Sequence, residues 1–181
     1  MFVACDLDDP NVVEQLVDFQ REVLSPFREL RLVHPDAMHF TLAFLADQDS
    51  SSVGVLKQRL KEVHAAPFKL SLAGVTAFPT PERPRVIVAS VERGSNELSA
   101  LAQSVRAALA AIGVWYDSKP FVPHMTLARA SFATTRLSET LRLSSGRFFG
   151  EVVISTMRLK SSELTPAGPL YRTLAELPLE E

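Results

Sequence analysis

Alternating and helically spaced apolar residues divide the chain into strands and helices. Residues 68–78 alternate between apolar and polar as a half-buried strand does, whereas the apolar residues of 98–112 recur at helical spacing. Pro10 follows Asp9, which predicts a helix start there, and Pro26 marks its end. The expected strands are 2–7, 30–33, 38–45, 68–78, 85–91, 122–129, 147–154, 157–164 and 170–177. Three further helices are expected: one capped by Ser50 to Ser52 that reaches about His64, one capped by Ser95 that ends at Gly113, and a short one at 134–142.

The order strand, helix, strand, helix, strand in each half predicts an α+β fold with antiparallel pairing, repeated once. We expect one domain over 1–181 that is bilobal, with pseudo-symmetric lobes at about 1–80 and 81–181 and room for strand exchange between them. Each lobe would carry an antiparallel sheet with flanking helices beside a central cleft. The proline-rich segment 79–84 is the expected crossing between the halves.

A five-residue motif occurs twice, as HFTLA at 39–43 and as HMTLA at 124–128. Side chains two residues apart on a strand point to the same face. His39 and Thr41 therefore share one face, as do His124 and Thr126, and the apolar residues between them face the other way. Two related half-structures would each offer one imidazole and one hydroxyl to a shared site.

Two imidazoles facing one substrate suit acid–base chemistry at a phosphodiester, because one can activate water while the other protonates the leaving oxygen. The hydroxyls of Thr41 and Thr126 can donate hydrogen bonds to the phosphate oxygens. Arg129 suits a phosphate in charge and geometry, but on an unbroken strand it would face away from His124. Reaching the phosphate would require a bulge, a strand end or the length of its side chain. The residues alone leave open which histidine is acid and which is base.

Other chemistries have weaker support in the sequence. Neither motif carries a carboxylate or thiolate at ligand spacing, so we expect no metal site and no cofactor. We interpret His34 and His64 as ordinary surface or loop histidines. Cys5, the single cysteine, excludes an internal disulfide and is interpreted as a buried small residue.

Charge is unevenly distributed along the chain, although the net charge is only −2. Residues 81–172 carry 12 Lys and Arg against 7 Asp and Glu, which favours a local anion site there but no extended nucleic-acid groove. No apolar run reaches the roughly 18 residues of a membrane span, and the N-terminus lacks the basic region of a signal peptide. We expect a cytoplasmic monomer.

The chain resembles the 2H phosphoesterase superfamily, named for paired His-x-Ser/Thr motifs. Within it, the chain is similar to the bacterial and archaeal RNA 2′,3′-cyclic phosphodiesterases, also described as 2′-5′ RNA ligases. The resemblance covers nearly the whole chain and depends on the order and spacing of its motifs. These are MFVACDLDD at the start, MHFTLAFL at 38–45, RPRVIVASV at 83–91, FVPHMTLAR at 121–129 and LKSSELTPAGPLYRTLAELPL at 159–179. One departure is Ala46-Asp47 after Leu45, where relatives usually have glycine.

The resemblance implies a metal-independent hydrolase that opens the 2′,3′-cyclic phosphate of an RNA end or a cyclic nucleotide to a 2′-phosphomonoester. By motif position, His39 would protonate the departing 3′ oxygen and His124 would activate water. Thr41, Thr126 and Arg129 would hold the phosphate. Run in reverse, the same site would join a 5′-hydroxyl to a cyclic phosphate as a 2′-5′ linkage.

A non-catalytic module that binds a nucleotide or an RNA end is the alternative, although binding alone does not require two titratable groups. Base preference would depend on stacking residues in loops. Phe121 and Phe148 are candidates, but we assign both to the core.

Overall fold

The computed structural model describes residues 1–46, 51–132, 136–165 and 168–180, and this part of the chain contains nine strands and four α-helices. The strands are β1 (Phe2–Asp6), β2 (Leu30–Leu32), β3 (His39–Phe44), β4 (Phe68–Phe78), β5 (Val86–Val91), β6 (His124–Ala130), β7 (Phe148–Ile154), β8 (Thr156–Thr165) and β9 (Gly168–Pro178). The helices are α1 (Pro10–Phe19, continued by a π-helical turn at Gln20–Leu24), α2 (Ser52–Leu60), α3 (Ser95–Ala111) and α4 (Ser138–Leu143), with a 3-10 turn at Pro35–Ala37.

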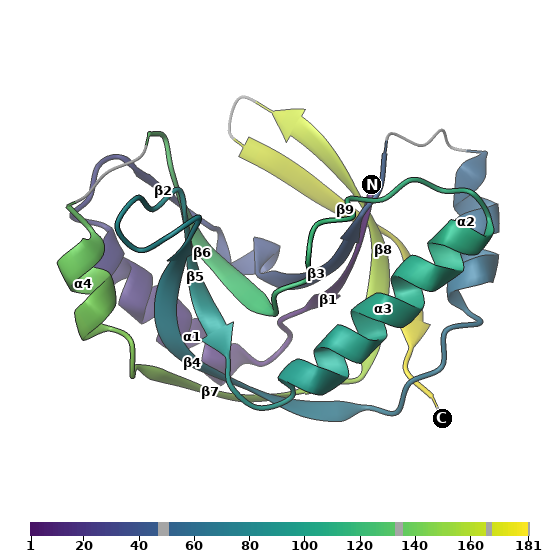
Figure 1. The fold of residues 1–181 in the computed structure, drawn as a ribbon, viewed down its shortest axis with the longest axis horizontal. Helices are drawn as coiled ribbons and strands as arrows, with labels where there is room; N and C mark the ends of the chain where they lie inside the picture. Colours follow the sequence, from purple (N-terminus) through teal and green to yellow (C-terminus); the bar gives the residue numbers. More distant parts are fainter. Residues whose placement is uncertain (47–50, 133–135, 166–167, 181) are drawn as a thin grey trace.

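The strands form two antiparallel sheets, which confirms the expected α+β fold (Figure 1). One sheet has four strands in the order β3-β1-β8-β9, and the other has five in the order β2-β6-β5-β4-β7. Each sheet therefore combines strands from the first and the second half of the sequence. The two motif strands belong to different sheets, yet β3 and β6 contact each other.

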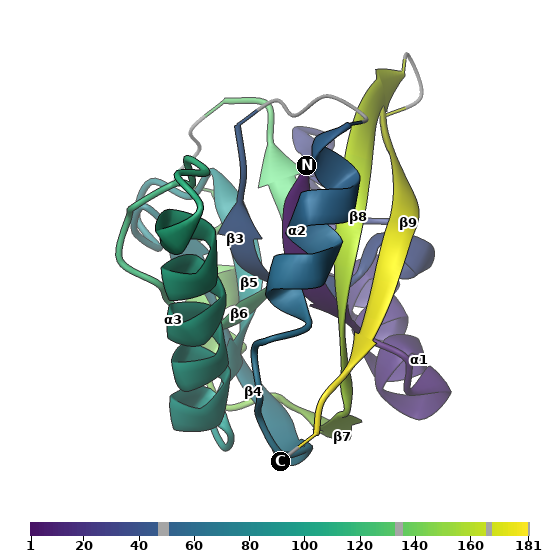
Figure 2. The same ribbon diagram turned by 90° about the vertical axis from the view of Figure 1, so that its right-hand side faces the viewer.

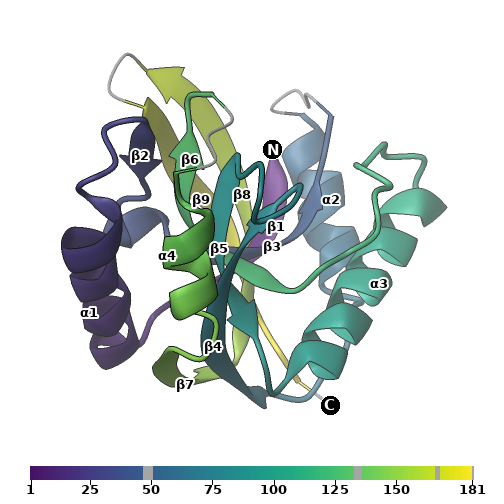
Figure 3. The same cartoon turned by 60° about the vertical axis from the view of Figure 1, so that its left-hand side comes forward.

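The helices lie on the outside of the two sheets. α2 and α3 pack side by side against the four-stranded sheet, where α3 contacts β3 and α2 contacts β9 (Figure 2). α1 contacts β7 and α4 contacts β4, so both lie on the five-stranded sheet (Figure 3).

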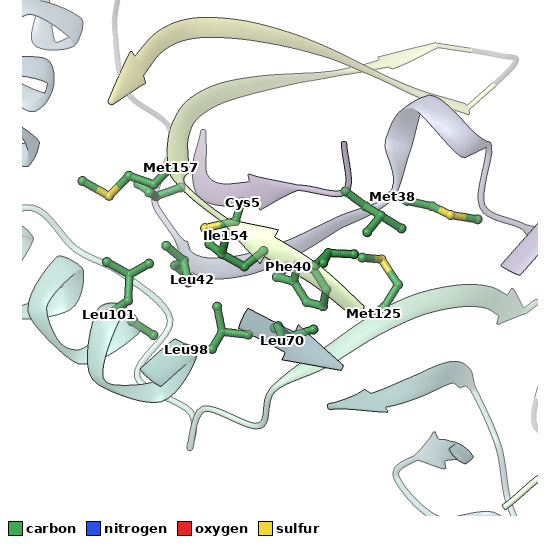
Figure 4. Close-up of a cluster of buried hydrophobic side chains, with 14 of the residues drawn as sticks. Cys5, Met38, Phe40, Leu42, Leu70, Leu98, Leu101, Met125, Ile154 and Met157 are labelled. Carbon is green, nitrogen blue, oxygen red and sulfur yellow. The ribbon is translucent and has the colours of Figure 1, made fainter. Parts of the chain in front are cut away.

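The apolar partners of the motif residues hold the two sheets together. Phe40 and Leu42 of β3 and Met125 of β6 are at most 1% exposed and lie in one cluster with side chains from α3 and from β1, β4, β7 and β8 (Figure 4). Burial of such large side chains stabilises the fold by about 1.5–3 kcal/mol each. Cys5 belongs to the same cluster, and burial raises the pKa of its thiol to about 12, so it is an inert core residue.

Helix starts agree with the sequence in part. Asp9 caps α1 as expected, and its carboxylate accepts hydrogen bonds from the backbone amides of Asn11 and Val12 at 3.0 and 3.1 Å. Ser95 does not cap α3 but is its first residue. The cap is Gly94, whose φ of 76° favours glycine and where a Cβ would lie 2.4 Å from the Lys69 carbonyl oxygen.

Other boundaries differ by a few residues. α2 begins at Ser52 and ends at Leu60 rather than near His64, and α4 begins at Ser138. Asp47, Ser50 and residue 134, which also entered the sequence interpretation, lie outside the described residues.

The expectation for the proline-rich segment 79–84 was wrong. This segment joins β4 to β5, which pair with each other inside the five-stranded sheet, so it turns the chain within one sheet. The chain passes between the sheets elsewhere: through α1, from β2 to β3 through the 3-10 turn, through α2, and from β7 to β8. Within the described residues, no helix has both the length and the apolar composition needed to cross a membrane.

Candidate active site

Both motifs present their polar residues to one cavity between the sheets. The cavity has a volume of about 370 Å³, and its lining includes all five residues singled out in the sequence. These are His39, Thr41, His124, Thr126 and Arg129. They come from strands of different sheets, so the folded chain brings together residues that lie 85 positions apart.

A β-bulge in each motif strand carries the cavity face beyond the threonine. In β3, Ala43 pairs with Val3 and Thr41 pairs with Ala4, so Leu42 is the extra residue. In β6, Ala128 pairs with Ile87 and Thr126 pairs with Val88, so Leu127 is the extra residue. One extra residue reverses the alternation of side chains after it.

The bulges bring the fifth residue after each histidine to the cavity. Arg129 thereby lines the cavity with His124, and Phe44 occupies the equivalent position after His39. On an unbroken strand Arg129 would face away from His124, and the bulge turns it to the same side. The two halves thus share a backbone irregularity, but one supplies a cation and the other an aromatic ring.

Gln20, which the sequence analysis overlooked, supports the bulge in β6. It lies in the π-helical turn after α1 and is only 4% exposed. Its side-chain amide donates hydrogen bonds to the carbonyl oxygens of Leu127, at 2.8 Å, and Val33, at 2.9 Å. A polar residue at a position expected on a buried helix face was the only signal in the sequence.

The two histidine rings are fixed in the same way. Nδ1 of His39 lies 2.7 Å from the Ala37 carbonyl oxygen, and Nδ1 of His124 lies 2.6 Å from the Val122 carbonyl oxygen. A carbonyl can only accept, so each Nδ1 carries a proton and donates it. This leaves Nε2 of each neutral ring as the nitrogen that can take up or deliver a proton at a substrate.

Burial lowers the pKa of both histidines. For His39 burial is the largest effect and brings the pKa to about 4, although the Ala37 carbonyl and the Asp6 carboxylate favour the charged form. For His124 burial again lowers the pKa, the Val122 carbonyl opposes it, and the positive charge of Arg129 adds to it. Both rings are therefore neutral near pH 7 in the free protein, and a bound anion would raise their pKa values.

Charged residues lie behind His39, on the four-stranded sheet. Asp6 is the direct partner of His39 across the β1–β3 ladder, and the ammonium of Lys160 lies 2.6 Å from its carboxylate. Lys160 is 5% exposed, and Arg158 also reaches Asp6 at 3.4 Å. The other carboxylate oxygen of Asp6 is buried and has no hydrogen-bond partner among the described residues.

Aromatic rings hold the imidazoles from the side. Tyr171 of β9 meets His39 edge-to-face with centroids 5.3 Å apart, and Phe2 lies 5.0 Å from the same ring. Phe78 meets His124 edge-to-face at 5.0 Å. Tyr171 and Phe78 also line the cavity, although nothing in their local sequence distinguishes them from other strand aromatics.

Several expectations for other residues need correction. Phe121 packs against the core, as assigned, whereas Phe148 is 56% exposed rather than part of the core, and neither lines this cavity. His34 is exposed, as expected, but it does line the cavity. Among the described residues, no three His, Cys, Asp or Glu side chains cluster as a metal-binding group. The chemically active groups here are two imidazoles, two hydroxyls and a guanidinium, a set suited to proton transfer at a bound anion.

Comparison with known proteins places this geometry among phosphoesterases. The model of the family described as LigT like Phosphoesterase matches the chain twice, at residues 7–88 and 89–171. Each match contains one copy of the repeated motif.

Individual relatives agree with the family match over most of their length. An RNA 2′,3′-cyclic phosphodiesterase of Archaeoglobus fulgidus is 37% identical over 174 residues, which covers 96% of this chain and 97% of the relative. A crystal structure from Thermus thermophilus has a TM-score of 0.80 at 32% identity, covering 98% of this chain and 96% of that chain. The structure of Escherichia coli LigT complexed with 3′-AMP has a TM-score of 0.82 at 25% identity, covering 99% and 97%.

Proposed function

This chain belongs to the LigT like phosphoesterase family, and we propose that it hydrolyses RNA 2′,3′-cyclic phosphate ends to 2′-phosphomonoesters by two-histidine acid–base catalysis. The observation that carries the proposal is the shared cavity, into which two strands from different sheets each direct a histidine and a threonine. Relatives over nearly the whole chain bear the name RNA 2′,3′-cyclic phosphodiesterase, which supports the choice of substrate.

In the proposed reaction, Nε2 of His124 takes a proton from water as the water oxygen attacks phosphorus. The bond between phosphorus and the 3′ oxygen breaks, and Nε2 of His39 delivers a proton to that oxygen. His124 gains one proton and His39 loses one, so each ring ends in the protonation state in which the other began. Proton exchange with solvent then restores the starting state.

The electrostatic surroundings of the two rings support this assignment of roles. A general acid must be charged before it acts, and of the two rings only His39 has a carboxylate, Asp6, that favours the charged form. Burial, Lys160 and Arg129 outweigh this carboxylate in the free protein and lower the pKa of the ring. Arg129 favours the neutral form of both rings, and at His124, where no carboxylate opposes it, this is the form that a base requires. The anionic phosphate would supply the remaining stabilisation of the His39 imidazolium.

The phosphate itself would be held by Thr41, Thr126 and Arg129. Hydroxyl donors from opposite walls fix the non-bridging oxygens, and the guanidinium offers charge-assisted hydrogen bonds. Because every step uses side chains of the chain, the proposed mechanism requires no cofactor. The same arrangement run in reverse would form a 2′-5′ linkage from a 5′-hydroxyl and a cyclic phosphate.

We also propose that residues 1–181 act as one catalytic unit in a cytoplasmic monomer. The support is that one chain supplies both histidines, both threonines and the arginine to the same cavity. The single cysteine is buried in the core, as suits a chain that uses no disulfide.

The experiment is hydrolysis of a short RNA that ends in a 2′,3′-cyclic phosphate, in EDTA and without nucleotide, with the product identified as a 2′- or a 3′-phosphate. We expect the 2′-phosphate, and a loss of about 10²–10⁴-fold in rate for His39→Ala and for His124→Ala. His64→Ala, which removes an exposed histidine outside the cavity, is the matched control. Binding of the RNA without conversion would instead favour the non-catalytic module.

A further inference from the structure

Two arginines lie directly opposite each other on neighbouring strands at one end of the cavity. Arg31 of β2 is the register partner of Arg129 of β6, and both line the cavity. Directly opposed residues of an antiparallel pair have Cβ atoms roughly 5 Å apart, and like charges at such positions destabilise a sheet. The placement is therefore unfavourable unless an anion lies between or beside the two guanidiniums.

Nothing in the described part of the chain neutralises this pair. Neither Arg31 nor Arg129 has a carboxylate oxygen within 4.0 Å, and no side-chain hydrogen bond occupies either guanidinium. Six other arginines contact carboxylates. These are Arg21, Arg59, Arg93, Arg142, Arg158 and Arg172. The remaining described arginines do not face another arginine across a strand pair.

We infer that Arg31 forms a second phosphate subsite, which binds the phosphodiester immediately 5′ of the terminal nucleotide and so selects an oligonucleotide over a cyclic mononucleotide. The inference rests on the proposed function, because it takes the reacting phosphate to lie between His39 and His124.

The position of Arg31 indicates a phosphate other than the reacting one. β2 is the edge strand of its sheet, one strand beyond the strand that carries His124 and Thr126. Within β6, the bulge lies between Thr126 and Arg129. Arg31 is the cross-strand partner of Arg129, five residues along β6 from His124. The guanidinium of Arg129 can extend toward the reacting phosphate, which leaves Arg31 for the next one.

The surroundings of Arg31 also fit an RNA strand that leaves the cavity over β2. Arg31 itself is exposed, and His34, which also lines this end, has a side chain that is 74% exposed. Asp36 is directed to His34, at 3.5 Å, rather than to Arg31. Glu29, two residues before Arg31 in the chain, forms no ion pair with it. A phosphate here would meet a cation at the solvent boundary, where the remainder of the strand can extend freely.

The test compares a dinucleotide ending in a 2′,3′-cyclic phosphate with the same dinucleotide whose internal phosphate is replaced by a neutral methylphosphonate. In the wild-type protein we expect the replacement to lower kcat/KM about tenfold, a loss typical of a charge-assisted hydrogen bond. In Arg31→Gln we expect the same replacement to have no further effect. Arg21→Gln, which removes an ion-paired arginine in the π-helical turn after α1 and outside the cavity, should retain the tenfold loss.

Salt dependence provides a second measurement of the same contact. The slope of log(kcat/KM) against log salt for the dinucleotide should be shallower by about 0.7 in Arg31→Gln than in the wild type, because one phosphate contact to a single strand is lost. A full tenfold methylphosphonate effect that persists in Arg31→Gln would overturn the subsite, as would the absence of that effect in the wild type.

Failure of the proposed function is recognised separately. If the wild type converts neither dinucleotide nor cyclic mononucleotide, hydrolysis is refuted. The dissociation constants of the dinucleotide 2′-phosphate and of its methylphosphonate form then report the subsite without catalysis. A tenfold difference that vanishes in Arg31→Gln supports it, and equal constants in the wild type overturn it.

Discussion

The buried imidazole of His39 makes the free energy of unfolding depend on pH. Its pKa is about 4 in the folded protein against 6.5 when freely solvated. The unfolded chain therefore binds a proton that the folded chain excludes, so stability is full above pH 6.5 and is lost as pH falls toward 4. The gap corresponds to a limit of about 3 kcal/mol, of which about 2 kcal/mol is reached by pH 5.

The perturbation is His39→Gln, which keeps an amide donor for the Ala37 carbonyl but does not titrate. Urea unfolding followed by circular dichroism gives the free energy of unfolding of both proteins from pH 8 to pH 5. We expect the difference between wild type and variant to change by ~2 kcal/mol over this range, in favour of the variant at low pH. His64→Gln is the control for replacing an exposed imidazole.

Parallel stability curves for wild type and His39→Gln would contradict a buried, neutral His39, because a histidine that is freely protonated in the folded protein causes no such divergence. The site would then be more solvated than the structure indicates. Titration of the His39 ring by NMR separates the two cases directly. We expect its pKa to lie well below 6.5 in the free protein and to rise when inorganic phosphate is added.

Other predictions concern the supports of the site. Gln20→Leu leaves the Leu127 carbonyl without a side-chain donor, so we expect a loss of about 1–3 kcal/mol in stability and a fall in kcat/KM as the bulge relaxes. Lys160→Met removes the nearest cation from Asp6 and leaves it Arg158 at 3.4 Å, so we expect a loss of at most about 3–5 kcal/mol and a raised pKa of His39, read by urea unfolding and NMR. The pH profile of kcat/KM should be bell-shaped, with limbs that belong to the coupled histidine pair, and a monotonic profile would contradict it.

Matched variants keep the first two predictions from being explained by misfolding alone. Gln20→Glu retains the shape of the side chain but cannot donate to a carbonyl, so it should resemble Gln20→Leu in kcat/KM. The double variant Asp6→Asn, Lys160→Met removes both charges and should recover much of the stability lost in Lys160→Met. Full activity in Gln20→Leu, or an unchanged His39 pKa in Lys160→Met, would contradict the roles assigned to these residues.

Local pattern was sufficient for most of the secondary structure and for the composition of the site. Alternating apolar and polar residues predicted β4 at 68–78, and the repeated motif identified two strands whose polar residues line one cavity. Both successes depend on the two-residue period of a strand, which the sequence displays directly.

The remaining features depend on contacts between distant segments. The course of segment 79–84 was mispredicted because prolines mark a turn without indicating which strands it joins. The bulges that bring Phe44 and Arg129 into the cavity arise from pairing with β1 and β5 and cannot be read from β3 and β6 alone. Tyr171 enters the site only because β9 joins the sheet of β3.

The division of roles between His39 and His124 can be tested by changing the leaving group. In a 2′,3′-cyclic substrate whose 3′ oxygen is replaced by sulfur, the departing thiolate is far more stable than an alkoxide and needs no proton. We predict that His39→Ala recovers most of its activity on this substrate, whereas His124→Ala, which still lacks a base for water, does not. Equal impairment of His39→Ala on the oxygen and sulfur substrates, or rescue of His124→Ala instead, would contradict the proposed mechanism.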